Sequence, residues 1–598
     1  MNVFQHYKNP WVWLAAGLLA ILMRGLWLDV MDVDAAQYAS ISMEMMQNGS
    51  WLEVKHRYTD YLDKPPLLFW SSALSYLIFG LSTWAYKLPS LVAALGGVYG
   101  IYRFSKLFYT EKTARQAAFL LASATGFFVL CNDVRTDTLL LGTTSLAIWQ
   151  LAEYLQNKRW KYLIGAFVFI GLAMLAKGPI GLVVPALAVG THLLLQRDFR
   201  NIFRWQWLAG LGITALILLP MCWGLYSQFD LHPEKPLNDR ISTSGLYFFF
   251  WEQSFGRITG NNVWRNDAGP FYFFHVYLWA FLPWALLLPA ALWFHSRKAW
   301  RKIFNFHQTH LPEAYSLGGF LLTFIALSLS RYKLPHYIFV TLPWAAVLIA
   351  AWLNAETGAK KTEAKAVTIV PTAWTIVSYV TYLLALTVVF MLIGFVFPGN
   401  ILSQTISQGE HGTGLSYGLM FGNILTWCIL LAGAGWLLLR TIRNPWKVDT
   451  EVFVQRGVLV AVLIGFVLNF YFYPNLLPYQ STATIGRYIH EQGIPKNKIA
   501  FFKRHGHALD FYSQAISKRM DSREHVRQTA RVLGEIWIYT NQKGKSELDE
   551  AGIPYESVYE MGHFQAALLN ARFLNPATRA ESLEPVWLLR VAGDGKGL

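Results

Sequence analysis

Charged residues are scarce in this sequence of 598 residues: Asp, Glu, Lys and Arg make up 15% of it, whereas hydrophobic residues make up 54%. Soluble globular domains carry about 25% charged residues, which keep their surfaces hydrated. A chain with so little charge cannot cover its apolar surface with polar groups. The composition therefore argues against an ordinary soluble protein and indicates a chain that crosses a membrane many times.

Cysteine is also rare, because the sequence has only Cys131, Cys222 and Cys428, all within or beside apolar segments and far apart. This argues against a disulfide framework and leaves the redox compartment open. The formal net charge of +15 does not indicate nucleic acid, because the Lys and Arg residues stand mostly in short loops between apolar segments. Membrane orientation requires basic loops of this kind. We therefore expect no nucleic-acid partner.

Long apolar stretches recur along the chain. A helix needs about 20 residues to cross roughly 30 Å of hydrocarbon, and we predict about thirteen such transmembrane helices. The first is too long for a signal-peptide core and has no convincing cleavage site behind it, so we expect it to be retained. The predicted spans centre on residues 11–30, 88–106, 116–131, 138–155, 161–176, 179–196, 206–225, 271–294, 315–330, 337–354, 371–397, 413–439 and 456–473.

Basic loops predict the orientation. With the N-terminus in the cytoplasm, every inside loop carries Lys or Arg, namely the loops around residues 103–115, 158–161, 197–204, 297–302, 360–365 and 440–447. An odd number of spans then places everything after Tyr473 outside. We therefore expect a multi-pass protein of the cytoplasmic (inner) membrane.

The composition changes after residue 473. Residues 474–598 are polar and mixed, with strand-like runs at 498–502, 536–539 and 586–591 and helix-like stretches at 481–492, 525–533 and 545–551 between them. We predict two domains: an all-α membrane domain over 1–473 and a soluble α/β domain over 474–598 on the outer face.

Charge recurs in the predicted outer loops, where Lys and Arg should be rare. The first outer loop, about 32–87, begins with a helical pattern over 34–48, which we expect to form an amphipathic helix at the interface. The stiff sequence DKPP follows at 63–66. Further charged outer segments are NDVRTD (132–137), KGP (177–179), WEQSFGRITGNNVWRND (251–267) and RYKLPHY (331–337).

Each of these residues also has a simpler explanation. Asp32 or Asp34 could serve simply as the cap of a helix. Lys177, Arg331 and Lys333 could extend to the interface as isolated cations. Asp133 and Asp137 could simply form ion pairs with Arg135 and have no further role. The histidines have simple explanations too: His275 and His336 could be packed or interfacial, and His505 and His507 could belong to a solvated turn rather than a metal site. The recurrence of cations beside acids on the outer side weakens these explanations jointly. Cations beside long apolar helices suit a lipid with an anionic head.

The motifs together resemble those of the GT-C glycosyltransferases related to protein O-mannosyltransferases, and most closely the bacterial branch with the lipid A aminoarabinose transferase. The matching segments are Asp34 with Tyr38-Ala39, Asp63-Lys64-Pro65-Pro66, Arg135-x-Asp137, Lys177-Gly178, Glu252 with Arg257, and Lys333-Leu334-Pro335-x-Tyr337. With their order, the thirteen predicted spans and the outer C-terminal domain, the resemblance covers essentially the whole chain.

The resemblance implies a GT-C fold and inverting transfer of a sugar from a polyprenyl-phosphate carrier to a lipid or protein acceptor, with the active site facing the periplasm or outside. It implies catalytic roles for Asp34, on the acceptor side, and for Asp137. It implies that the lipid phosphate is bound or surrounded by Lys64, Arg257, Tyr38, Tyr61, Lys333, Tyr337, Arg135 and Lys177. Asp63 and Glu252 fall where a divalent metal could be held. We expect a monomer with membrane lipids around it.

Two departures from the family pattern matter. Ala35 replaces the second acid of an Asp-Glu pair, so that role is either absent or transferred to Asp32. Gln37 replaces a basic residue of the aminoarabinose branch, which leaves the acceptor open. The alternative functions are a polytopic transporter or lipid flippase, for which Arg24 within the first span is the main support, and a noncatalytic envelope sensor. A transporter would place its charges near the membrane midplane in repeated halves.

Overall fold

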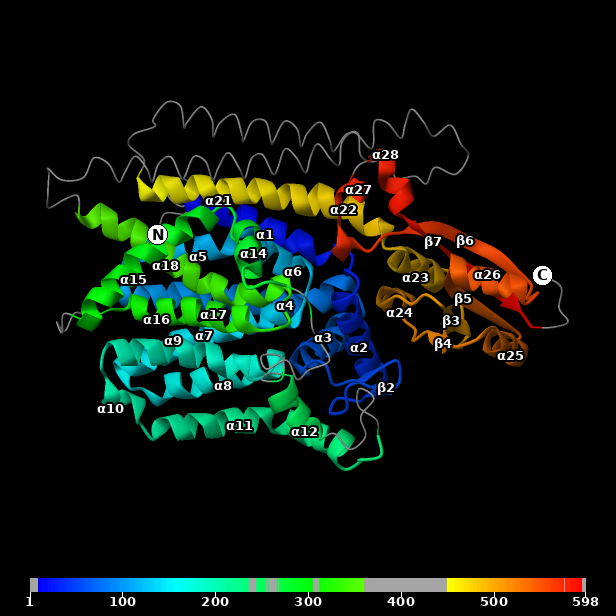
Figure 1. Ribbon diagram of the computed structural model, residues 1–598, viewed down its shortest axis with the longest axis horizontal. Coiled ribbons are helices and arrows are strands. Elements are labelled where there is room, and N and C mark those ends of the chain that lie inside the picture. Colours follow the sequence, from blue (N-terminus) through cyan, green and yellow to red (C-terminus); the bar gives the residue numbers. More distant parts are fainter. Residues whose placement is uncertain are drawn as a thin grey trace.

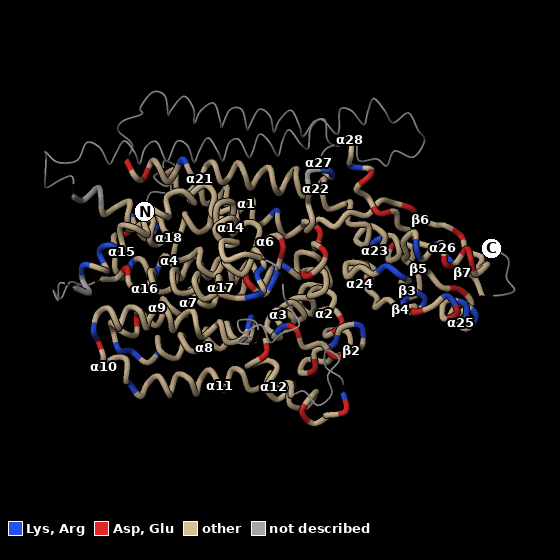
Figure 2. The backbone as a smooth tube through the Cα atoms, viewed as in Figure 1, with Lys and Arg blue, Asp and Glu red and all other residues tan. Residues whose placement is uncertain are grey.

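The computed structural model describes residues 9–235, 244–253, 256, 266, 268–304, 311–359, 449–574 and 576–593. Figure 1 shows a bundle of long helices, with a smaller unit of strands and helices at one end and two short helices, α2 and α3, between them. Charged residues gather at the two ends of the bundle, whereas its middle is almost free of them (Figure 2). This distribution is typical of helices that cross a membrane.

The bundle contains most of the chain. Its helices are α1 (Pro10–Leu26), α4 (Thr83–Phe108), α5 (Glu111–Ala122), α6 (Thr125–Asn132), α7 (Thr136–Asn157), α8 (Trp160–Lys177), α9 (Ile180–Leu195), α10 (Phe199–Ile202), α11 (Gln206–Leu225), α14 (Tyr272–Ala280), α15 (Leu288–Phe304), α16 (Glu313–Leu317), α17 (Thr323–Leu329), α18 (Leu342–Ala359), α21 (Thr450–Val467) and α22 (Tyr473–Leu476). Short π- or 3₁₀-helical turns extend them: η2 (Tyr226–Asp230), η4 (Ala285–Leu287), η5 (Gly318–Leu322), η6 (Pro335–Thr341), η7 (Leu468–Phe472) and η8 (Leu477–Tyr479). The turns α12 (Gly245–Tyr247) and η3 (Phe248–Glu252) follow η2.

The predicted spans at 371–397 and 413–439 lie outside the described residues, and every other predicted span coincides with a helix or a pair of helices. Among the described residues, four helical stretches are long and apolar enough to cross a membrane alone, and α5 and α6, bent by 53°, would form a fifth as one broken span. The four stretches are Trp160–Lys177, Phe199–Asp230, Pro335–Ala355 and Thr450–Tyr479. The membrane character is therefore confirmed, and the total of thirteen spans stays a prediction.

The helix predicted over 34–48 is present as α2 (Asp34–Asn48), but its environment differs from the prediction. Ten of its fifteen residues are buried, Glu44 and Ser42 included, and it packs against α3 (Leu67–Phe79) and α24 (His507–Ser513). An interfacial amphipathic helix would leave one face exposed to lipid or water. The difference arises because the C-terminal residues, far away in sequence, cover its polar face.

The C-terminal segment is an α/β unit with a five-stranded sheet in the order β4-β3-β5-β7-β6. The strands are β3 (Ile499–Phe502), β4 (Lys518–Met520), β5 (Glu535–Asn541), β6 (Tyr555–His563) and β7 (Glu584–Ala592). β3 is parallel to β4 and β5, whereas β7 is antiparallel to β5 and β6. The predicted strands correspond to β3, β5 and β7, and β4 and β6 were missed. β4 has only three residues and β6 carries a bulge at Ser557/Tyr559, so neither shows clear alternation.

The helices of this unit are α23 (Ser481–Glu491), α24, α25 (Arg523–Leu533), α26 (Gln542–Glu550), α27 (Ala571–Leu574) and α28 (Pro576–Arg579). The short turns η9 (Lys496–Lys498), η10 (Ala566–Leu568) and η11 (Ala580–Ser582) connect them with the strands. The helices predicted at 481–492, 525–533 and 545–551 correspond to α23, α25 and α26. The division into two domains at residue 473 stays a prediction.

Buried ionic contacts join the C-terminal unit to the segment before the candidate site. Arg57, in the turn between β1 (Lys55–His56) and β2 (Thr59–Asp60), contacts the buried Asp510 at 2.6 Å, and Glu44 of α2 accepts hydrogen bonds from the backbone of the same turn at 2.7 and 2.8 Å. Asp32 is also buried here and accepts from Thr482 Oγ1 at 2.7 Å. Burial raises the pKa of Asp32, and Thr482 opposes the shift. Asp32 therefore faces the C-terminal unit rather than taking over the role of the missing acid at Ala35.

Candidate functional site

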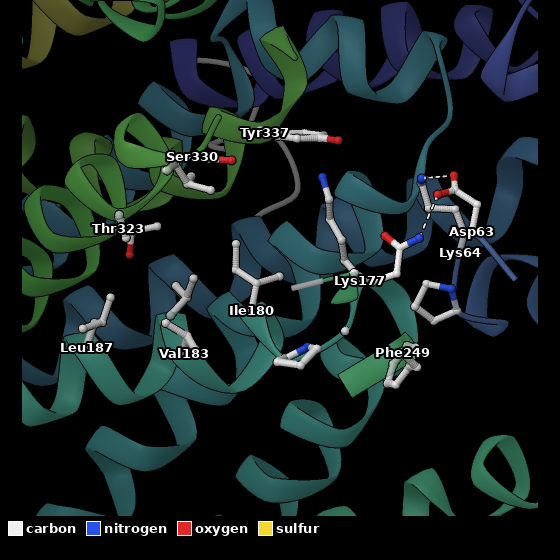
Figure 3. Close-up of a pocket in the computed structure, with 17 residues that line it drawn as sticks. Asp63, Lys64, Lys177, Ile180, Val183, Leu187, Phe249, Thr323, Ser330 and Tyr337 are labelled. Atoms are coloured by element: carbon white, nitrogen blue, oxygen red, sulfur yellow. Dashed lines mark hydrogen bonds and ion pairs between the residues drawn. The ribbon is translucent and has the colours of Figure 1, made fainter. Parts of the chain in front are cut away.

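Four of the segments that the sequence marked as charged outer loops meet around one pocket, together with residues of two predicted spans. They come from the loop before α3, the turn between α8 and α9, η3, α17 and η6, and Figure 3 shows their side chains around a common space. The lining residues are Asp63, Lys64, Pro65, Lys177, Gly178, Pro179, Ile180, Val183, Val184, Leu187, Phe249, Gln253, Thr323, Ala326, Leu327, Ser330 and Tyr337.

One end of the pocket is polar and cationic. Lys64 forms an ion pair with Asp63, whose other carboxylate oxygen accepts from Gln253 Nε2 at 3.0 Å. The Lys177 ammonium lies 3.9 Å from the centre of the Tyr337 ring and pairs with Asp137. The side chains of Lys64 and Lys177 are 15% and 13% exposed. Two partly shielded ammonium groups at one end of a cavity favour an anionic ligand group there.

The rest of the pocket is an apolar trough between two helices. On α9, the lining residues Ile180, Val183, Val184 and Leu187 have the spacing i, i+3, i+4, i+7, so they share one face. Thr323, Ala326, Leu327 and Ser330 repeat that spacing along α17 and the residue after it. In Figure 3 the row Leu187, Val183, Ile180 leads toward Lys177 and Lys64. The pocket therefore has the shape and polarity of a site for an anionic amphiphile.

Local sequence explains the position of Lys177. α8 ends at Lys177 because Gly178 has φ +79° and ψ −158°, which only glycine adopts easily. Three residues later, a Cβ at Gly181 would collide with the backbone of Ala173 and Met174. These two glycines permit the tight turn between α8 and α9, which places the ammonium group at the head of the trough.

A second cluster of charges lies beside the pocket, around Arg135. This guanidinium pairs with Asp34 at the start of α2 and with Asp133 at 2.9 Å. Burial opposes the charge on Arg135, but Asp133 and Asp34 outweigh it and raise the pKa of Arg135 above its ordinary value. The Asp34 side chain is 36% exposed and that of Asp133 only 18%. Asp34 is therefore the carboxylate of this pair that a second substrate could reach.

Asp137 pairs with a different residue from Arg135, the partner that the sequence suggested. Its carboxylate pairs with Lys177 rather than Arg135 and is 4% exposed, whereas Asp133 does pair with Arg135. The geometry gives Asp137 the task of holding Lys177. Its predicted catalytic role stays a prediction.

The two predicted tyrosines of the first outer loop do not line this pocket, although Tyr61 lines a smaller cavity that shares Lys64 and Pro65 with it. Tyr61 packs edge-on against Phe69, with 5.9 Å between ring centres, and Tyr38 lies 5.8 Å from the same ring. Burial, together with Tyr61, Asp34 and Asp63, raises the pKa of Tyr38 well above its ordinary value. Tyr38 therefore keeps its proton at physiological pH.

Other predicted site residues are not brought into the pocket lining. Lys333 donates to the carbonyl of Ala268 at 3.0 Å, and its backbone exchanges hydrogen bonds with Asn266, so it anchors the segment before α14. Arg257 lies outside the described residues.

The predicted metal ligands form no complete set in the described part of the chain. Glu252 ends η3, next to Gln253, but no group of three or more His, Cys, Asp and Glu residues with metal-binding geometry occurs among the described residues. Asp63 is already bonded to Lys64 and Gln253. The metal assignment of Asp63 and Glu252 stays a prediction.

Two residues near the pocket were not predicted as parts of the site. Gln253 follows Glu252 in the fourth outer segment and bonds to Asp63. His336, interpreted from sequence as packed or interfacial, lies between Arg135 and Asp137. Its place within RYKLPHY, between Lys333 and Tyr337, was the available signal.

Comparisons with known proteins agree with this geometry. Residues 63–223 match the family model described as dolichyl-phosphate-mannose-protein mannosyltransferase. The chain is 27% identical over 57% of its length to undecaprenyl phosphate-alpha-4-amino-4-deoxy-L-arabinose arabinosyl transferase 1 of Pseudomonas fluorescens, covering 57% of that protein. It is 28% identical over 58% of its length to the corresponding transferase of Pseudomonas savastanoi, covering 61%. The matches thus span less than two thirds of these curated relatives.

The similarity in structure extends much further along the chain. ArnT from Cupriavidus metallidurans, solved bound to undecaprenyl phosphate, superposes with a TM-score of 0.67 over 97% of both chains, at 18% identity. Its apo state superposes with a TM-score of 0.66. The predicted GT-C fold is thereby confirmed at a coarser level: this chain has the mostly helical fold found in ArnT, whereas the total of thirteen spans and the soluble C-terminal domain stay predictions.

Proposed function

We propose that this protein is an integral membrane glycosyltransferase that transfers a sugar from a polyprenyl-phosphate carrier to a lipid or protein acceptor at the outer face of the cytoplasmic membrane. The observation that carries the proposal is the pocket, because it joins two cations to an apolar trough between α9 and α17. A polyprenyl phosphate has this same division into an anionic head and a long apolar tail. The names of the curated relatives and the lipid bound to ArnT support this class of donor.

The charges suit displacement at the anomeric carbon of the carrier-bound sugar. As the acceptor oxygen forms its bond to this carbon, the bond to the phosphate oxygen breaks and its electron pair leaves with the phosphate. Lys64 and Lys177 stabilise the charge that grows there. Asp34, held by Arg135, receives the proton if the acceptor is a hydroxyl group. Attack opposite the leaving phosphate inverts the configuration at the anomeric carbon.

The remaining parts of the proposal concern topology and assembly. The predicted thirteen spans would place the C-terminal α/β unit on the outer side, next to the candidate site. The predicted monomeric state stays part of the proposal.

The first test is binding of undecaprenyl phosphate by the purified protein in nanodiscs. A charge-assisted contact to phosphate is worth about 1.5 to 3 kcal/mol, so Lys64→Ala should weaken binding by roughly 10-fold to 150-fold. Lys64→Arg should recover only part, because a planar guanidinium does not replace an ammonium group. Lys55→Ala, which removes a cation that is 33% exposed from the same outer loop, is the matched control and should bind like the parent.

A second measurement separates the enzyme from the alternative function. The parent should release undecaprenyl phosphate from an undecaprenyl-phosphate sugar in the presence of membrane extract containing acceptors. Absence of binding by the parent would refute the lipid site. Binding and transbilayer movement of the lipid without sugar transfer would favour a flippase instead.

A further inference from the structure

His336 lies between the two ion pairs of the candidate site. Its Nδ1 is 3.4 Å from Arg135 Nη1, and its Nε2 is 3.7 Å from Asp137 Oδ2. Arg135 pairs with Asp34, and Asp137 pairs with Lys177. The imidazole is 14% exposed and stands in η6, directly after Pro335 and before Tyr337. It therefore connects the acceptor-side acid to the donor-side cation through one ring.

The neighbours of His336 determine its tautomer. A guanidinium carries only donors, so the imidazole nitrogen that faces Arg135 must accept. The ring is then neutral, and its proton lies on Nε2, which faces the carboxylate of Asp137. Both contacts are longer than an ordinary hydrogen bond, so their effect is on position more than on binding strength.

We propose that His336 is a positioning residue for sugar transfer, which holds Arg135 on Asp34 at a fixed distance from the Asp137–Lys177 pair. This inference rests on the proposed function, because only a displacement reaction needs the acceptor-side acid and the leaving phosphate to be held together. In such reactions a small displacement of a reacting group costs far more in rate than in substrate affinity. The backbone is suited to this task, since Pro335 restricts its own φ angle and Lys333 is tied to Ala268.

Three substitutions test the two contacts separately. His336→Leu removes both polar atoms and should lower kcat by about tenfold to 100-fold, while KM for the polyprenyl-phosphate sugar and Kd for undecaprenyl phosphate stay within about twofold of the parent. His336→Asn keeps an acceptor near the position of Nδ1 and should restore most of kcat. His336→Gln places its amide nearer the position of Nε2 and should restore less. His275→Leu, an exposed histidine of α14, is the control.

The outcomes separate this inference from the proposed function. If the parent neither binds undecaprenyl phosphate nor transfers sugar, the proposed function fails and this inference fails with it. If the parent transfers and His336→Leu keeps the parental kcat, only the role of His336 is refuted. Rescue by Gln but not by Asn would refute the contact with Arg135, and an equal loss of kcat and affinity in all three variants would show a merely structural residue.

Discussion

At the scale of single residues, the candidate site consists of cations held in place by acids. Lys64 has Asp63, Lys177 has Asp137, and Arg135 has Asp133 and Asp34. In pairs that are largely shielded from solvent, as these are, the cost of desolvating both charges offsets much of their mutual attraction, so they are weak contributors to stability. Their value here lies in holding charged groups at the edge of an apolar trough before a ligand arrives.

Asp34 is the acid whose removal should affect transfer most. Asp34→Asn should leave the protein folded and inserted but lower the transfer rate by roughly 100-fold or more, because a positioned base or charge stabiliser is lost. Asp133→Asn changes the other acid on the same guanidinium and should cost less, since that carboxylate is more shielded. Single-turnover assays with a polyprenyl-phosphate sugar would measure both rates. An anionic acceptor needs no deprotonation and should reduce the loss; near-parental turnover of Asp34→Asn would remove it from the mechanism.

At the scale of elements, close contact between α4 and α7 holds the middle of the bundle together. A Cβ at Gly142 of α7 would collide with the carbonyl oxygen of Ala93 in α4. Small residues of this kind let membrane helices approach closely. Gly142→Ala should therefore lower stability by about 1 to 3 kcal/mol, the usual cost of overpacking. Thermal unfolding in detergent would measure this, with Gly212→Ala as the control, because nothing lies within 4 Å of a Cβ there.

The junction between the C-terminal unit and the β1–β2 hairpin should be sensitive to acid. Burial, Arg57 and His505 lower the pKa of His56 to about 3, and burial, Arg57 and His56 lower that of His507 well below its ordinary value. Because the unfolded chain would bind protons near pH 6.5, stability from these groups is complete above that pH. It is lost as the pH falls from about 6.5 toward the folded pKa.

Comparing variants with the parent separates the contribution of these histidines to the pH dependence of stability from that of other groups that titrate in the same range. Thermal midpoints between pH 7.5 and pH 4.5 should fall less steeply for His56→Gln than for the parent. His490→Gln, which changes an exposed histidine at the end of α23, should follow the parent. Asp32 at the same junction has a raised pKa, so its contribution to stability increases as the pH falls. The decisive quantity is therefore the difference between the variants in the slope of thermal midpoint against pH, not the slope of the parent alone. Identical slopes for all three proteins would contradict the assignment.

At the scale of the whole molecule, the position of the C-terminal unit relative to the membrane is the main open prediction. The basic inside loops predict that residue 546 lies outside. In a chain whose native cysteines are replaced by serine, Ser546→Cys should react with a membrane-impermeant maleimide in intact spheroplasts. Lys161→Cys, on a predicted inside loop, should react only after lysis. The reverse pattern of labelling would overturn the topology.

The sequence by itself determined the membrane character, the helical spans within the described residues, three of the five strands and the charged outer segments that supply the polar end of the pocket. Apolar run length, alternation and charge on the unexpected side of a membrane are local properties, so they can be read from residues such as Lys64, Lys177 and Tyr337 without coordinates. The resemblance of the motifs added the fold class.

Only the tertiary structure decided which charges meet. Asp137 forms an ion pair with Lys177, Lys333 donates a hydrogen bond to Ala268, and Asp32 accepts one from the C-terminal unit. Helix α2 is buried rather than interfacial. These pairings join residues between about 40 and 450 positions apart. A carboxylate near several cations has no local preference among them, so its partner depends on how the helices pack. The role of His336 depends on the same packing, because its two neighbours come from elsewhere in the chain.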